Sequence, residues 1–97
     1  MARFKVYQLG DELALDVQAN LLDGLQTRVV VPLIRESDVK RYAARLNPRF
    51  EIGGIVHVMM TEFLAAVPVS ELGVSVADLS AHGDDIVAAT DFLFQGF

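Results

Sequence analysis

Residues 3–17 read RFKVYQLGDELALDV, two short runs of alternating side chains on either side of Gly10-Asp11. Apolar and polar side chains alternate through residues 3–9, which predicts a β-strand. Glycine accepts the positive φ that a two-residue hairpin turn requires, so Gly10-Asp11 predicts such a turn. The alternation continues through residues 13–17 and is typical of a half-buried antiparallel strand. The chain is therefore expected to begin as an antiparallel hairpin.

More strands are expected beyond this hairpin. A loop over residues 20–26 is signalled by Asp23-Gly24. Pro32 cannot donate a ladder hydrogen bond, so it marks a strand end or an edge position. Gly53-Gly54 predicts a second tight hairpin turn, and residues 70–75 predict a loop. The expected strands are residues 27–33, 50–52, 55–60 and 62–69.

Five of the eight basic residues lie between residues 35 and 49. Ser37 could cap a short helix that ends at Asn47-Pro48. Its apolar side would be Val39, Tyr42, Ala43 and Leu46. The alternative is a solvent-exposed loop, which is the usual fate of a charged stretch.

The periodicity becomes helical after Asp78. Ser80 is the expected N-cap of a helix that runs to about Phe94, and Gly83 in its first turn weakens it by about 1 kcal/mol. The apolar stripe is Ile86, Ala89, Thr90 and Leu93. Five or six short antiparallel strands and one C-terminal helix predict a single mainly β domain over residues 1–97. We expect a small barrel-like sheet with the helix packed on it.

Composition points to a protein partner. Of the 97 residues, 53% are hydrophobic, which indicates that self-association or another partner covers some of the surface. All eight Lys and Arg lie in residues 1–50, whereas residues 51–97 hold seven acids and no basic residue. Direct binding of nucleic acid is therefore not expected, since it requires phosphate neutralisation. The absence of cysteine, of a signal peptide and of a 20-residue apolar span leads us to expect a cytoplasmic protein away from the membrane.

No catalytic or cofactor site is expected. His57 is predicted to be a partly buried strand histidine. His82 near Asp84 and Asp85 has no further ligand at metal-binding spacing, so no metal site is expected. Glycine-rich phosphate loops and nucleophile motifs are absent as well. An enzymatic or small-molecule-binding barrel is thus the least favoured function.

The chain ends Phe92-Leu93-Phe94-Gln95-Gly96-Phe97, which contains half of its phenylalanines. On a helix Phe92 and Phe94 are separated by about 200°, so both cannot face one core. Either these aromatics fix the helix to the sheet, or some of them project outward as an anchor for another protein.

The sequence resembles the CcdB-type toxins of bacterial toxin–antitoxin modules, which poison DNA gyrase. The resemblance covers essentially the whole chain and depends on the order and spacing of several short segments. They are Phe4-Lys5-Val6-Tyr7, Asp16-Val17-Gln18, Val30-Val31-Pro32-Leu33, Met59-Met60-Thr61, Val67-Pro68-Val69-Ser70, Val76-Ala77-Asp78-Leu79-Ser80, Asp85-Ile86 and Phe94 with Gly96.

The resemblance implies an SH3-like barrel with a C-terminal helix, assembled as a homodimer. It implies a protein that binds the gyrase A subunit, traps the enzyme on cleaved DNA and performs no chemistry itself. It also implies a CcdA-type antitoxin whose disordered tail folds on the toxin, and contact with DNA only through that antitoxin. The alternative is a protein of the same fold that binds its antitoxin and represses its operon with it but no longer poisons gyrase efficiently.

The resemblance also assigns residues to these roles. Family members end in Trp, Gly and an aliphatic residue, whereas this chain has Gln95, Gly96 and Phe97. The gyrase-binding residues expected from the match are Leu21, Leu22, Asp91, Phe94, Gln95, Gly96 and Phe97. The basic segment and the first hairpin are expected to bind the antitoxin, because an acidic or amphipathic peptide could fold there. Its candidate residues are Arg35, Lys40, Arg41 and Arg45.

Overall fold

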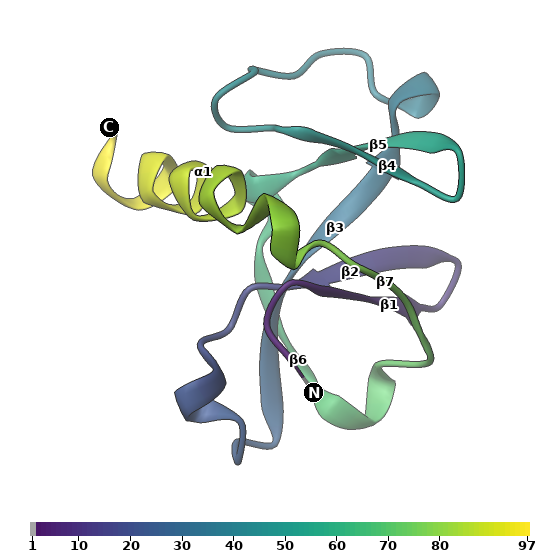
Figure 1. Cartoon of the computed structure of the whole chain (residues 1–97), viewed down its shortest axis with the longest axis vertical. Helices are drawn as coiled ribbons and strands as arrows, with labels where there is room; N and C mark the ends of the chain where they lie inside the picture. Colours follow the sequence, from purple (N-terminus) through teal and green to yellow (C-terminus); the bar gives the residue numbers. More distant parts are fainter. Residues whose placement is uncertain (1) are drawn as a thin grey trace.

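In the computed structural model, which describes residues 2–97, seven antiparallel strands form a curled sheet against which one C-terminal helix packs (Figure 1). The strand order is β4-β5-β3-β2-β1-β7, and β6 pairs with β3 beside β5. The elements are β1 (Lys5–Leu9), β2 (Glu12–Asp16), β3 (Thr27–Arg35), β4 (Arg49–Ile52), β5 (Ile55–Met59), β6 (Ala65–Pro68), β7 (Ser75–Asp78) and α1 (Gly83–Gln95). The predicted mainly β class with a C-terminal helix is confirmed, with one strand more than the upper expectation.

The β1–β2 hairpin is confirmed. Leu9 pairs with Glu12 across the two-residue turn, and Gly10 has the expected positive φ of 58°. The first strand begins at Lys5 instead of residue 3, because Phe4 has a φ of 72° and interrupts the extended backbone. The expectation of a half-buried return strand is wrong, since Ala14 and Leu15 point to opposite faces of β2 and are both buried.

β3 is the centre of the sheet, and it extends past Pro32. Along one side it pairs with β2. Along its other side it pairs first with β6, from Thr27 to Val30, and then with β5, from Leu33 to Arg35. Pro32 lies where the partner changes, and its carbonyl accepts the Met60 N–H at 3.0 Å. The missing N–H of Pro32 therefore falls at a gap in the ladder, so the expectation of a strand end or edge at this residue is wrong.

The β4–β5 hairpin is also confirmed. Ile52 pairs with Ile55 across Gly53 and Gly54, whose φ values are 60° and 81°. Positive φ at both central residues is the geometry of a type I′ turn, which matches the right-handed twist of the flanking strands.

The short helix predicted after Ser37 does not form. A single 3₁₀ turn, η2 (Glu36–Asp38), is followed by a loop that reaches β4. Asn47 holds this loop, because its Oδ1 accepts the Ala43 N–H at 3.0 Å and its Nδ2 donates to the Met59 carbonyl at 3.0 Å. Those bonds to a buried asparagine replace the helical hydrogen bonds, and the loop alternative is the observed one.

Two strand expectations in the second half of the chain are corrected. The strand expected over residues 62–69 is shorter, because the 3₁₀ turn η3 (Thr61–Phe63) precedes β6. A second 3₁₀ turn, η4 (Val69–Glu71), occupies the start of the expected loop. Strand β7 was not predicted, and it pairs with β1 with a register irregularity between Val6 and Tyr7. β7 has only four residues and is mostly exposed, so its sequence lacks the apolar alternation that identifies a strand.

Helix α1 begins two residues later than predicted. The 3₁₀ turn η5 (Ser80–His82) precedes it, so Ser80 is not its N-cap. The Ser80 N–H instead donates to the Asp78 Oδ1 at 2.9 Å, and this hydrogen bond lowers the pKa of Asp78. Ile86 and Ala89 are the buried residues of the helix. They join a core formed by Val6, Leu15, Val31, Leu33, Phe50, Met59 and Leu79.

Candidate functional site

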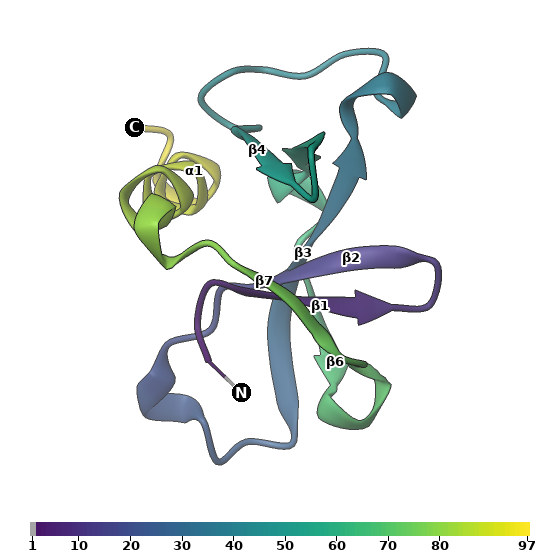
Figure 2. The same ribbon diagram turned by 45° about the vertical axis from the view of Figure 1, so that its right-hand side comes forward.

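Two exposed elements lie on one side of the molecule. Figures 1 and 2 both place the C-terminal end of α1 on the same side as the 3₁₀ turn η1 (Asn20–Leu22), opposite the turn of the β1–β2 hairpin. These are the two elements that carry the residues expected to bind gyrase. The helix and η1 approach this side from distant parts of the sequence, so only the fold brings them to a common face.

The end of α1 exposes two aromatic rings. Phe94 is 69% exposed and Phe97 is 75% exposed. Gly96 ends the helix in the left-handed conformation, with φ 79°, and its N–H donates to the Phe92 carbonyl at 2.9 Å. Glycine adopts this conformation without the steric penalty of a Cβ atom, so Gly96 fixes the direction in which Phe97 leaves the helix. Gln95 is exposed beside it.

Phe92 differs from the two rings that follow it. It is half-buried, and the Arg45 guanidinium lies over its ring at 4.3 Å from the centroid. The predicted separation of Phe92 from Phe94 is therefore observed. Phe92 meets the loop between β3 and β4, while Phe94 and Phe97 are exposed, so the interpretation that some rings project outward holds for the last two.

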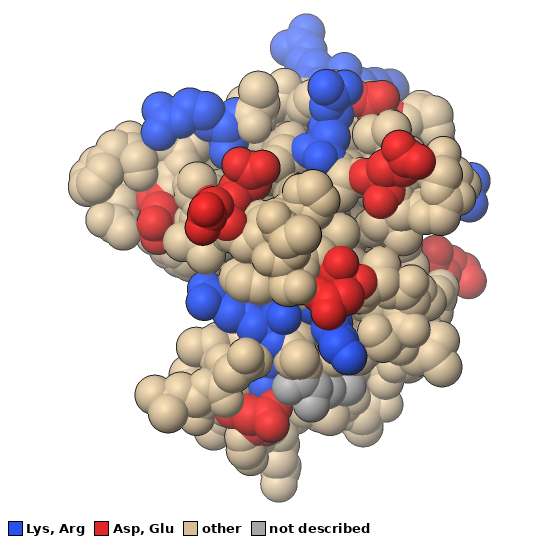
Figure 3. Space-filling view, in the orientation of Figure 1, with Lys and Arg blue, Asp and Glu red and all other residues tan. Residues whose placement is uncertain are grey.

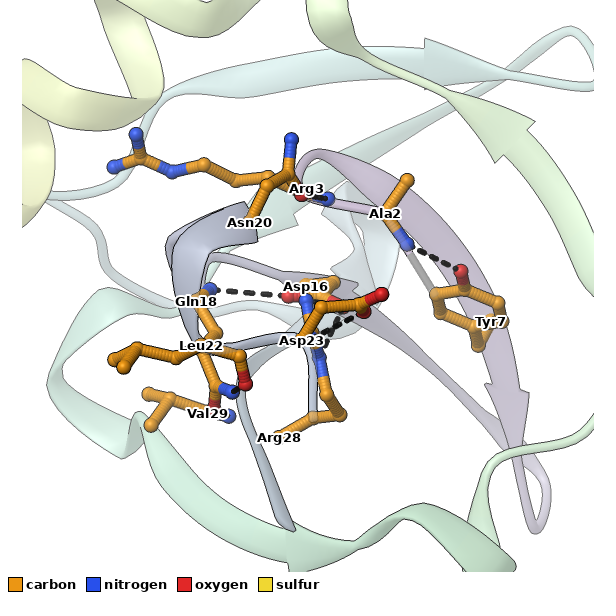
Figure 4. A network of polar contacts seen from close by, with 10 residues as sticks. All are labelled: Ala2, Arg3, Tyr7, Asp16, Gln18, Asn20, Leu22, Asp23, Arg28 and Val29. Carbon is orange, nitrogen blue, oxygen red and sulfur yellow. Dashed lines mark hydrogen bonds and ion pairs between the residues drawn. The ribbon is translucent and has the colours of Figure 1, made fainter. Parts of the chain in front are cut away.

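Leu21 is the most exposed large apolar residue of residues 2–97, with 93% of its surface accessible, and Leu22 beside it is about half exposed. Gln18 braces the turn that carries them (Figure 4). Its Nε2 donates to the Leu22 carbonyl at 2.9 Å, and its Oε1 accepts the Val29 N–H at 3.0 Å. The exposed leucines are thus presented by a turn that is tied to β3.

A buried ion pair lies beneath this turn. Arg28 Nε donates to Asp16 Oδ2 at 2.8 Å, and Arg28 Nη2 lies 2.7 Å from the same oxygen. Both side chains are almost fully buried, and Arg28 Nη1 also reaches Asp23 in the loop at 3.2 Å (Figure 4). Burial raises the pKa of Asp16, against the lowering effects of the Gln18 N–H and of Arg28. This pair could not be predicted from the sequence, because Asp16 occupies a polar position of an alternating strand.

The four basic residues expected to bind the antitoxin line different grooves. Arg35, Lys40 and Arg41 are exposed and line two neighbouring grooves, which share Glu12, Ile34 and Asp38. The groove beside Lys40 and Arg41 has a volume of about 550 Å³. Its apolar lining consists of Pro32, Ile34, Val39, Met60 and Phe63. Arg45 instead lines a different cleft, between the 42–51 segment and α1.

That cleft has a volume of about 1010 Å³, and Asp91 and Phe97 line it from the helix side. Figure 3 shows Lys and Arg gathered over the end of the molecule formed by the segment between β3 and β4, with acidic side chains over α1. Asp91 is exposed, so the end of the helix presents a negative charge beside its aromatic rings.

Arg49 forms an ion pair with Glu36. Its Nη1 donates to Glu36 Oε2 at 2.7 Å, and the Tyr42 hydroxyl donates to the same oxygen at 2.8 Å. The hydrogen bonds from Arg49 and then from Tyr42 lower the pKa of Glu36. This cluster connects η2 to the start of β4 and shapes the loop between them.

Each histidine contacts a neighbouring group. His57 is buried in β5, as predicted, with Nδ1 2.9 Å from the Ile55 carbonyl. His82 packs against Phe50, with ring centroids 5.2 Å apart. Within residues 2–97 there is no group of three His, Cys, Asp or Glu residues that could hold a metal ion. In the same range, no helix has the length and apolar character needed to cross a membrane.

Comparison with known protein families agrees with this geometry. The family described as CcdB protein matches residues 3–96 of the 97-residue chain. The chain belongs to the CcdB family. The match spans η1, the basic segment and α1 as far as Gly96, so it includes almost every residue discussed above.

Members of the CcdB family are toxins of toxin–antitoxin systems, and they act by binding rather than by catalysis. The family therefore identifies the chain as a toxin of a toxin–antitoxin system. The curled seven-stranded sheet with one C-terminal helix is consistent with the CcdB fold.

Proposed function

We propose that this CcdB-family toxin binds the A subunit of DNA gyrase as a homodimer in the cytoplasm and traps the gyrase–DNA cleavage complex. Family membership supports a toxin–antitoxin toxin. The proposed contacts are made by η1 and by the end of α1, and no bond is made or broken by the toxin.

The exposed apolar side chains on one face carry this proposal. Leu21 is 93% exposed on a braced turn, and Phe94 and Phe97 are largely exposed at the capped end of a helix. Leaving such side chains in water forgoes burial worth about 1.5–3 kcal/mol each. Aromatic anchors of this kind dominate the energetics of protein interfaces, so the face suits a protein partner.

Titration calorimetry with the dimerisation fragment of gyrase A tests the proposal. We expect binding by the wild-type chain and a loss of at least about tenfold in affinity for Phe94→Ala and for Phe97→Ala, as for interface anchors. Phe63→Ala is the matched control, because Phe63 is a similarly exposed phenylalanine on η3. The proposal fails if fragments from the host and from other bacteria all give no heat of binding.

Homodimerisation is supported by the apolar surface that the single chain leaves uncovered. Apart from the residues above, the exposed large apolar side chains include Leu25, Ile55, Val56, Val74 and Val76. A monomer of this size rarely exposes so many without a partner. Sedimentation equilibrium should give a dimer at micromolar concentration, and a strictly monomeric protein would contradict this part of the proposal.

We further propose that a CcdA-type antitoxin folds its disordered tail over Arg35, Lys40 and Arg41. The apolar groove beside the last two residues offers a surface for the tail's apolar side chains, and the three cations complement acidic ones. Lys40→Glu combined with Arg41→Glu should weaken binding of a synthetic antitoxin tail, whereas Arg45→Glu, in a different cleft, should not. Unchanged affinity of the double variant would refute the electrostatic contribution.

Gln95 favours a second candidate function. In the resembling toxins a tryptophan precedes the penultimate glycine, and its ring stacks on an arginine of gyrase, a contact worth about 1–2 kcal/mol when desolvated. Because Gln95 stands in place of this tryptophan, the second candidate is a protein that binds its antitoxin, represses its operon with it and poisons gyrase only weakly. Induction in a sensitive strain separates the two functions. Growth arrest with accumulation of cleaved DNA supports the toxin, and normal growth supports the repressor.

A further inference from the structure

Phe92 is held at two points by two different parts of the chain. Its carbonyl accepts the Gly96 N–H at 2.9 Å, and its ring lies beneath the Arg45 guanidinium at 4.3 Å. The first contact comes from the chain end that carries Phe97. The second comes from the loop between β3 and β4. Phe92 therefore connects that loop to the C-terminal cap.

The last turn of α1 has little else to hold it. The buried residues of the helix are Ile86 and Ala89, and both lie before the last six helical residues. Beyond them only Thr90 and Phe92 are half-buried, while residues 93–97 are exposed. Helix ends with few buried contacts open locally at small free-energy cost. The contact between Arg45 and Phe92 is thus the main side-chain restraint on this turn.

The surroundings of Arg45 favour a guanidinium over the Phe92 ring, near the C-terminal end of α1. No carboxylate of residues 2–97 lies within ion-pair distance of the guanidinium, so an ion pair does not explain its placement. Asp85 and Asp91 line the same cleft from the helix side, and a positive charge near the C-terminus of a helix is stabilised by the helix dipole. The planar guanidinium also stacks on an aromatic face in a way that an ammonium group does not.

We propose that Arg45 is a positioning residue for the C-terminal anchor. By holding the ring of Phe92 it keeps the last turn helical and sets the direction in which Phe94 and Phe97 project. Arg45 then acts within the toxin, whereas Arg41 on the same loop lines the groove proposed for the antitoxin. The part of this inference that concerns gyrase depends on the proposed function, whereas the restraint on the helix does not.

Amide hydrogen exchange in the free protein tests the restraint without any partner. Arg45→Ala should speed the exchange of the Gln95 and Gly96 amides by about three- to tenfold, with the midpoint of global unfolding nearly unchanged. Arg45→Lys should restore part of the protection, because it keeps the charge and loses the planar stack. Arg41→Ala is the matched control and should leave exchange at these amides as in the wild type.

A Phe92→Leu background shows whether the effect of Arg45 depends on the aromatic ring of Phe92. Phe92→Leu keeps an apolar side chain but removes the aromatic face, so adding Arg45→Ala to it should cause no further increase in exchange. Wild-type exchange in the Arg45→Ala variant, or an equal increase for Arg41→Ala, would overturn the inference.

Binding to the gyrase A fragment is the second measurement. Arg45→Ala should lower affinity by at most the factor measured in hydrogen exchange, because affinity scales with the ordered fraction of the turn, and Arg45→Lys should recover part of the loss. If the wild-type chain binds no fragment, the proposed function fails while hydrogen exchange still decides whether Arg45 restrains the helix. If affinity is unchanged although exchange at Gly96 rises, Arg45 does not position the anchor.

Discussion

A Cβ atom added at Gly83 would lie 3.0 Å from Cε2 of Phe4, closer than carbon atoms normally approach. The Phe4 ring has little freedom to move away. Its backbone has φ 72°, its N–H donates to the Asp16 carbonyl at 2.7 Å, and its carbonyl accepts the Leu79 N–H at 2.8 Å. The start of α1 and the start of β1 therefore meet closely at position 83, where glycine leaves room for the ring.

Gly83→Ala should therefore destabilise the protein, although alanine is the better helix former. The gain in helix propensity is about 1 kcal/mol. Overpacking against a pinned ring costs about 1–3 kcal/mol, so we expect a net loss of up to about 2 kcal/mol in urea denaturation. In a Phe4→Leu background the same substitution should cost less, because the clashing atoms are gone. A Gly83→Ala variant that is more stable than the wild type would show that the ring moves aside.

Two arginines allow the stability contributions of a buried and an exposed ion pair to be compared. Arg28 and Arg49 each approach a carboxylate at 2.7 Å, but the first pair is buried and the second is exposed. Arg28→Met should cost about 3–5 kcal/mol of unfolding free energy, because Asp16 would be left as a buried unpaired charge. Arg49→Met should change stability little, because water screens its pair with Glu36. Equal losses in chemical denaturation would contradict this assignment.

Glu36 should titrate below the ordinary glutamate range. Its pKa in the folded state is lowered by hydrogen bonds from Arg49 and Tyr42. The stabilising contribution is therefore present above the unfolded-state pKa and is lost as the pH falls through the folded-state pKa. An NMR titration of the Glu36 carboxyl should show the low pKa, and Arg49→Gln should raise it more than Tyr42→Phe. A pKa equal to that of a short peptide would show that the cluster does not form in solution.

Leu21→Ser should weaken partner binding and leave folding intact. The leucine is almost fully exposed, so its loss removes little native packing. As an interface anchor it should contribute at least about tenfold in affinity for the gyrase A fragment. Phe63→Ser is the control, since Phe63 is also a largely exposed apolar residue but lies on η3. Calorimetry of both variants, with thermal unfolding as the check on folding, would contradict the assignment if Phe63→Ser lost as much affinity.

Local turn chemistry could be predicted well from the sequence. Gly10 and Gly53-Gly54 require positive φ whatever surrounds them, so both hairpins were correctly placed. The opposite directions of Phe92 and Phe94 also follow from helical geometry alone. Features that depend on neighbours distant in sequence could not be predicted in this way. Pro32 predicts a strand end, because the sequence does not show that β3 changes its pairing partner from β6 to β5 at this residue.

The same distinction between local and long-range features applies to the candidate site. That Phe92 and Phe94 cannot both face one core could be predicted from their spacing, but which rings are exposed, and the hydrogen bonds beneath Leu21, could not. Asp16, Gln18 and Arg28 are polar residues that a strand pattern assigns to solvent, and only the fold brings them together in a buried network. Arg45 likewise reads as one of several cations in a basic stretch, whereas its position over Phe92 depends on how the loop meets α1.

The central place of β3 has a consequence for synthesis of the chain. When residues 27–35 emerge from the ribosome, β1 and β2 are already available, but β5 and β6 follow only with residues 55–68. One edge of a nine-residue, largely apolar strand then stays unpaired until those residues arrive, and such an edge is a template for aggregation. Productive folding must therefore wait for the second half of the chain, and nascent chains that stall before residue 55 should depend on chaperones to stay unaggregated.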